Sequence, residues 1–177
     1  KENHPQLIQA GLISIFVSLL SDDDADIRNS AAFGIANFAC VSDNHHLIMH
    51  EGALTPLIRL SASDDPQAQL RSVAALRGLA VDETLRREIV QRGGIPPLLA
   101  LTRSEDVEVQ QETLSCLCNL SLSGCIGDNP LEFIEAVDVH ALVSFLCSAD
   151  TTYRLFGAVT LGNVASDLTH HDEIMEG

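Results

Sequence analysis

The sequence predicts an all-α solenoid, a stack of similar helical units, because three columns of residues recur along the chain with the same steps. The first two steps are 41 residues long and the third is 44 residues long. A period near 40 is typical of α-helical solenoids, in which each unit buries its apolar face against its neighbours. The three columns are Gly11, Gly52, Gly93 and Val137; Asp24, Asp65, Asp106 and Asp150; and Asn37, Gly78, Asn119 and Asn163.

The second unit shows why each repeat is expected to contain three helices. His45–Glu51 predicts a short first helix, Gly52 interrupts it, and Ala53–Leu60 predicts a second helix. After a loop, Pro66–Val81 has apolar residues at helical spacing and predicts a longer third helix. The whole chain is then one solenoid, with units near 3–41, 42–82, 83–123 and 124–166 and a partial unit at 167–177.

The column residues have local roles in this arrangement. A glycine between the first two helices permits a turn with positive φ. An aspartate before the third helix accepts hydrogen bonds from its first free amides, and such a cap contributes about 1 kcal/mol. Pro66 follows Asp65 at the first helical position, where a missing N–H costs nothing.

The fourth unit departs from this pattern. It has Val137 in place of glycine and three additional residues, which we place in the turn-rich segment 123–130. A β-branched residue resists positive φ. We therefore expect this junction to bend differently and the regular step between units three and four to be perturbed.

The helix junctions resemble those of armadillo repeats. The runs LIQAGLISIFVSLL, IMHEGALTPLIRL and IVQRGGIPPLLAL are similar to the junction between the first and second armadillo helices. The runs AAFGIANFA, TLSCLCNLS and TLGNVAS are similar to the end of the third helix. The resemblance covers the whole chain and implies a right-handed superhelix, as in β-catenin and importin-α. HEAT repeats, which usually have two helices and no glycine break, are the alternative.

The composition limits the class of partner. The formal net charge is −15, from 10 basic and 25 acidic residues, which argues against nucleic acid and anionic membranes. No apolar run is long enough to span a membrane. Five cysteines, an odd number in apolar helical stretches, suit buried thiols in a cytoplasmic or nuclear protein. Because neither end looks like a polar capping repeat, we expect a piece of a longer chain with flanking repeats or domains.

The resemblance also implies a binding site for an extended peptide. In armadillo proteins the third helices line a concave groove, and an asparagine near the end of each helix binds peptide main chain through its donors and acceptor. Residues four and seven positions earlier share that helical face. We therefore predict that the groove contains Asn37, Asn119, Asn163, Arg71, Arg77, Phe33, Ser115, Glu112 and Phe156. The alternative is that the asparagines only tie the third helix to the following loop.

The groove departs from two known types. An importin-type site for basic signals has tryptophans four residues before each asparagine, where this chain has Phe33, Ala74, Ser115 and Val159. A β-catenin-type groove is strongly basic, and here Arg71 and Arg77 supply the basic groups. We expect these two arginines to select an acidic or phosphorylated side chain.

Sequence patterns for catalysis, cofactors or metals are weak. Cys116 and Cys118 lie on roughly opposite helix faces, and His46 with His50 lacks a further ligand of suitable spacing. Neither a phosphate loop nor a nucleophile motif is present. The acidic pairs and triplet before the third helices predict a negative edge, which is either solvated or a docking strip for a basic partner.

These observations favour a non-enzymatic protein-interaction scaffold that needs no cofactor and binds an extended peptide or a partner helix in its groove. Two alternatives remain. The chain is a structural segment that packs laterally in a larger assembly, or an importin-like transport carrier, which the missing tryptophans disfavour.

Overall fold

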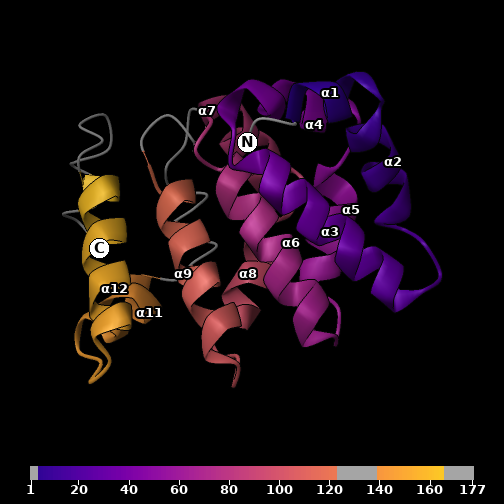
Figure 1. The fold of residues 1–177 in the computed structure, drawn as a ribbon. Helices are drawn as coiled ribbons and strands as arrows, with labels where there is room; N and C mark the ends of the chain where they lie inside the picture. The colour runs from indigo at the N-terminus through magenta and orange to yellow at the C-terminus, as the bar shows by residue number, and fades with distance from the viewer. Residues whose placement is uncertain (1–3, 123–138, 166–177) are drawn as a thin grey trace.

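The computed structural model describes residues 4–122 and 139–165, and these residues form helices joined by short loops, with no strand (Figure 1). The helices are α1 (His4–Gln9), α2 (Leu12–Leu19), α3 (Ala25–Ala39), the 3₁₀ helix η1 (Ser42–Asn44), α4 (His45–His50), α5 (Leu54–Ser61), α6 (Pro66–Leu79), α7 (Glu83–Gln91), α8 (Ile95–Leu101), α9 (Val107–Leu120), α11 (Val139–Leu146) and α12 (Thr151–Ala165). The predicted all-α class is confirmed.

The helices repeat as two short elements followed by a long one. Helices α1, α4 and α7 are the first helices of their units, and α2, α5, α8 and α11 are the second helices. The long third helices pack in order, α3 against α6, α6 against α9 and α9 against α12. Figure 1 shows these four helices side by side across the molecule. Their alignment creates the continuous face on which the predicted groove residues lie.

Glycine makes the turn between the first and second helices, as predicted. The φ angles of Gly11, Gly52 and Gly93 are 74°, 84° and 77°, in the left-handed region that glycine adopts without steric cost. The predictions for Val137 and for the insertion at 123–130 concern residues outside those that the structure describes.

The aspartate column caps the third helices, also as predicted. The side chain of Asp24 accepts hydrogen bonds from the amides of Asp26 and Ile27 at the start of α3. Asp65 and Asp106 cap α6 and α9 in the same way. Asp150 accepts from the amide of Thr152 at 2.6 Å in α12. The acidic edge therefore consists partly of carboxylates that stabilise helix starts.

A fourth column, which sequence reasoning missed, fastens the loop before each third helix. Its members are one helical turn beyond the caps and have the same steps of 41, 41 and 44 residues: Arg28, Gln69, Gln110 and Arg154. Each donates from its side-chain nitrogen to carbonyl oxygens of the preceding loop, for example Gln69 Nε2 to Ser63 O at 2.6 Å and Arg154 Nη1 to Ala149 O at 2.7 Å. We call these four residues the loop clamp.

The core runs along the stack and is mostly aliphatic. Leu57, Leu76 and Leu98 are fully buried, and Phe156 adds an aromatic ring at one end.

The prediction of buried thiols is right for Cys116 and wrong for Cys40 and Cys147, which are exposed. In the described residues no helix is long and apolar enough to cross a bilayer.

Candidate functional site

One cavity of about 350 Å³ collects most of the predicted groove residues from three successive third helices. Five of the nine line it, namely Phe33 and Asn37 from α3, Arg71 and Arg77 from α6, and Glu112 from α9. Its apolar floor consists of Ala36, Leu70 and Ala74. We call this cavity the groove pocket.

Arg71 forms one wall of the groove pocket together with Phe33. The guanidinium carbon of Arg71 lies 4.6 Å from the centre of the Phe33 ring, which is a cation–π contact. Phe33 is 47% exposed although it is aromatic, so it belongs to the surface and not to the core. Arg71 makes no hydrogen bond or ion pair to any described residue. Its N–H groups are therefore available to a ligand.

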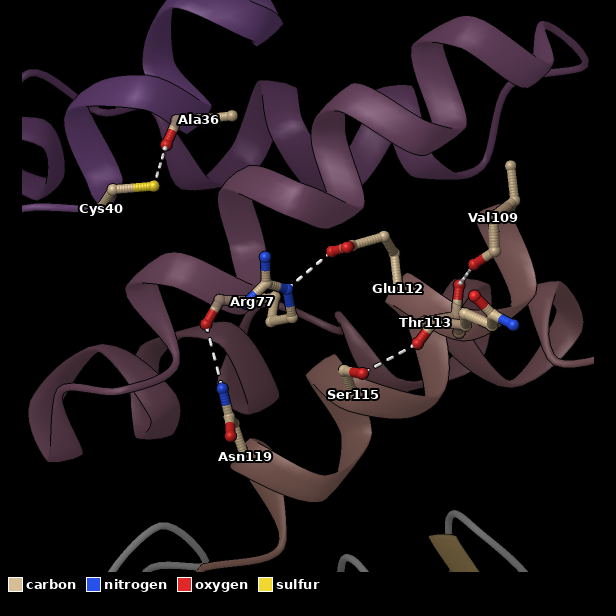
Figure 2. Close-up of polar contacts among 9 residues, drawn as sticks. Ala36, Cys40, Arg77, Val109, Glu112, Thr113, Ser115 and Asn119 are labelled. Carbon is tan, nitrogen blue, oxygen red and sulfur yellow. Dashed lines mark hydrogen bonds and ion pairs between the residues drawn. The ribbon is translucent and has the colours of Figure 1, made fainter. Parts of the chain in front are cut away.

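Arg77 and Glu112 form the opposite wall of the groove pocket and make an ion pair with each other. Arg77 Nε donates to Glu112 Oε2 at 2.6 Å, and Figure 2 shows the two side chains extending toward each other from α6 and α9. Both side chains are partly exposed, so solvent screens the pair. The expectation that Arg71 and Arg77 together select an anion is not supported, because Glu112 already neutralises Arg77.

The asparagines of the column differ in what they contact. Asn119 Nδ2 donates to the carbonyl oxygen of Arg77 at 3.2 Å (Figure 2), and Asn163 Nδ2 contacts Ser121 Oγ at 2.9 Å. Both bonds link a third helix to the preceding unit, which differs from the tie to the following loop that we considered above. Asn37 is exposed and its amide makes no hydrogen bond to any described residue. Asn37 is therefore the strongest candidate for a main-chain clamp.

Gly78 interrupts the asparagine column for a steric reason. A Cβ atom built at Gly78 would lie 3.1 Å from Ala39 Cβ and 3.2 Å from Ala39 O. A side chain at this position would therefore require the end of α3 to shift by a few tenths of an ångström. The same carbonyl of Ala39 is held by His45 Nε2 at 2.8 Å, which restricts its movement.

Besides Asn119 and Asn163, two further predicted residues lie outside the groove pocket. Phe156 is 1% exposed, and its ring centre lies 5.4 Å from that of Phe145 in α11, so it belongs to the core and its assignment to the groove is wrong. Ser115 is exposed on α9, where its hydroxyl donates to Gln111 O at 2.9 Å. It does not line the groove pocket.

Sequence reasoning missed Glu108, Gln111 and Cys40, which also line the groove pocket. Glu108 lies one helical turn before Glu112, so the spacing of the predicted residues contained the signal. Glu108 is exposed, and its carboxylate makes no hydrogen bond or ion pair to any described residue.

The described residues contain no group of three or more side chains suited to hold a metal ion. Burial raises the pKa of the Cys116 thiol well above its usual range, and burial also raises the pKa of the Cys118 thiol. Thiols in such surroundings are poor nucleophiles. Burial therefore disfavours the reactive thiolate at both positions.

The fold and the groove pocket define an α-solenoid of three-helix repeats. Residues 82–122 match the family model described as Armadillo/beta-catenin-like repeat. This match spans α7, α8 and α9 and the glycine turn at Gly93. Residues 82–122 therefore form an armadillo-type repeat, and the resemblance to armadillo repeats that the sequence predicted is confirmed.

Solved structures have the same architecture. A computationally designed armadillo repeat protein for modular peptide recognition is 24% identical, with a TM-score of 0.87 over 99% of this chain and 74% of that one. A designed armadillo repeat protein in complex with peptide (KR)4 is 25% identical, with a TM-score of 0.82 over 93% of this chain and 69% of that one. An engineered protein is 30% identical, with a TM-score of 0.72 over 87% and 62% of the two chains. No curated protein matches the chain in sequence.

Proposed function

We propose that this chain is a non-enzymatic scaffold that binds an extended peptide along the groove formed by α3, α6 and α9. The observation that carries this proposal is the groove pocket, to which three successive third helices contribute. In it the side chains of Asn37 and Arg71 make no hydrogen bond or ion pair to any residue that the structure describes, and Arg71 contacts the Phe33 ring. A designed armadillo protein of 25% identity is complexed with peptide (KR)4, which supports the same mode of binding.

Asn37 is the proposed contact to the peptide main chain. A carboxamide offers an acceptor and two donors, so it can pair with both the N–H and the C=O of one peptide unit. An extended peptide needs such partners, because its own backbone groups make no internal hydrogen bonds. Asn119 and Asn163 already bond to the preceding units, so they contribute mainly to stacking.

Selection from a random library of linear twelve-residue peptides tests this function. The peptides that bind are compared on the wild type and on Asn37→Ala by isothermal titration. We expect Asn37→Ala to weaken them by about 1 kcal/mol or more, because a peptide group loses its partner. Gln91→Ala, an exposed change at the end of α7, is the control and should leave affinity unchanged.

The alternative function is lateral packing of the solenoid in a larger assembly. It predicts that the library yields no peptide whose binding depends on Asn37, or that the selected peptides bind Asn37→Ala as tightly as the wild type. Either result would rule out the peptide groove.

A further inference from the structure

The groove pocket contains two kinds of charged side chain. Arg77 and Glu112 pair with each other at 2.6 Å, so their charges cancel locally. Arg71 and Glu108 line the same cavity and pair neither with each other nor with any other described residue. Two unpaired charges of opposite sign therefore face one space.

The positions of these two groups explain why they remain separate. Contact with the Phe33 ring holds the Arg71 guanidinium over α3. Glu108 projects from the first turn of α9, on the other side of α6. The paired Arg77 and Glu112 side chains and the floor residues Leu70 and Ala74 line the cavity with them. The cavity therefore presents a positive group toward α3 and a negative group toward α9.

Building on the proposed function, we propose that the groove pocket selects a peptide segment with one acidic and one basic side chain, the acid on Arg71 and the base on Glu108. In an extended peptide, residues i and i+2 point to the same side and lie about 7 Å apart, so an acidic and a basic side chain separated by one residue can both face the groove pocket. The apolar floor of the cavity accepts the methylene stems of long side chains.

Peptides with one sign of charge fit this cavity less well. A purely acidic peptide meets Glu108 and the field of a chain with a net charge of −15. A purely basic peptide meets Arg71. Selection by two unlike charges also distinguishes the two directions of the peptide. If the order of the charged residues is reversed, the basic residue lies beside Arg71 and the acidic residue beside Glu108, so that like charges meet.

Four synthetic nine-residue peptides test this proposal, each with two variable positions separated by one alanine. The variable positions are Glu and Lys, Lys and Glu, Glu and Glu, or Gln and Gln. Binding is followed by two-dimensional ¹⁵N NMR titration of the wild type, which detects millimolar affinities. We expect one mixed order to bind about fivefold tighter than the reverse order and than the other two peptides, the size of two partly exposed ion pairs.

The double variant Arg71→Glu with Glu108→Arg exchanges the charges and should reverse the preferred order. Arg103→Glu with Glu105→Arg is the control, since it makes the same exchange outside the groove pocket and should keep the wild-type preference. Both Arg71 and Glu108 have side chains that reach solvent, and the thermal melt of each variant shows that it is folded.

The outcomes separate this proposal from the proposed function. If all four peptides shift the signals of α3, α6 and α9 with equal affinity, the groove binds peptide and the charge selection is wrong. If the Glu–Glu peptide binds tightest, Arg71 selects a purely acidic ligand and the role of Glu108 is wrong. If none of the peptides shifts these signals, peptide binding in the groove is itself contradicted.

Discussion

At the scale of single residues, Arg77 joins two units through two different atoms. Its Nε donates to Glu112 at 2.6 Å, and its carbonyl oxygen accepts from Asn119 at 3.2 Å. One residue of α6 thereby contacts α9 through both its side chain and its main chain. Because of these two contacts, Arg77 supports the structure of the groove, whereas Arg71 is available to contact a ligand.

Asp65 offers a test of how the units are joined. Asn29 Nδ2 of the first unit donates to Asp65 Oδ2 of the second unit at 2.9 Å. This hydrogen bond is the main reason that the pKa of Asp65 lies below its usual value, and the amides of α6 add to it. The ionised carboxylate is therefore favoured in the folded state.

We predict that Asn29→Ala raises the pKa of Asp65 toward its ordinary value near 3.8. A carboxyl whose pKa is lowered by folding stabilises the protein above its unfolded pKa, and this stability disappears as the pH falls through the folded pKa. The variant should thus lose stability relative to the wild type above about pH 4, and the difference should shrink at lower pH. A ¹³C NMR titration of the Asp65 carboxyl measures the shift, and an unchanged pKa would contradict it.

At the scale of elements, the distance between third helices depends on the small residues where they meet. Gly78 at the end of α6 lies against Ala39 of α3, and a Cβ there would be only 3.1 Å from the methyl group of Ala39. Gly162 in α12 has open space around it, with nothing within 4 Å of an added Cβ. The two glycines are otherwise alike in lying inside a third helix.

We predict that Gly78→Asn, which would complete the asparagine column, destabilises the protein by about 1–3 kcal/mol because it forces α6 away from α3. Gly162→Asn is the matched control and should be neutral or slightly stabilising, since asparagine has a better helix propensity than glycine. Urea denaturation of both variants gives the free energies of unfolding. Equal stability of the two variants would show that the approach of α6 to α3 is not limiting.

At the scale of the whole molecule, the charge of −15 is large for 177 residues. The arginine–carboxylate ion pairs in the described residues, Arg77–Glu112, Arg87–Glu83 and Arg92–Glu88, are all partly exposed and each contributes little. Repulsion among unpaired carboxylates should therefore exceed the gain from these pairs, and added salt should screen it.

We predict that the melting temperature at pH 7 rises when sodium chloride increases from about 10 mM to about 500 mM, because the Debye length falls below the spacing of surface charges. A gain of 1 kcal/mol corresponds to roughly 2–4 °C for a chain of this size. Scanning calorimetry gives the shift. Near the sequence pI of about 4.6 the effect should vanish, which is the control. A melting temperature that falls with salt at pH 7 would show that ion pairs dominate.

The sequence predicted the helix turns and helix caps better than the side-chain contacts in the groove. Gly52 and Asp65 have roles set by their own backbone neighbours, so their spacing was enough to predict them. The pairing of Arg77 with Glu112 depends on how two units stack, which the spacing within one unit does not determine. Phe156 is buried because Phe145 of α11 packs against it, and no local pattern revealed that contact.

The loop clamp was missed for a different reason. Arginine and glutamine share the ability to donate to carbonyl groups but differ in charge, so the column does not stand out by residue identity. Glu108 was missed because the groove prediction considered positions four and seven residues before the asparagine, and Glu108 lies eleven residues before Asn119.

The loop clamp has a consequence for how the molecule comes apart. Each of its bonds closes within one unit, between a third helix and the loop that precedes it, whereas the bonds of Asn119 and Asn163 cross between units. A unit that detaches from the stack loses its crossing bonds and keeps its own internal ones. Opening should therefore proceed unit by unit, with protection from hydrogen exchange lowest at the ends of the stack and highest in its middle.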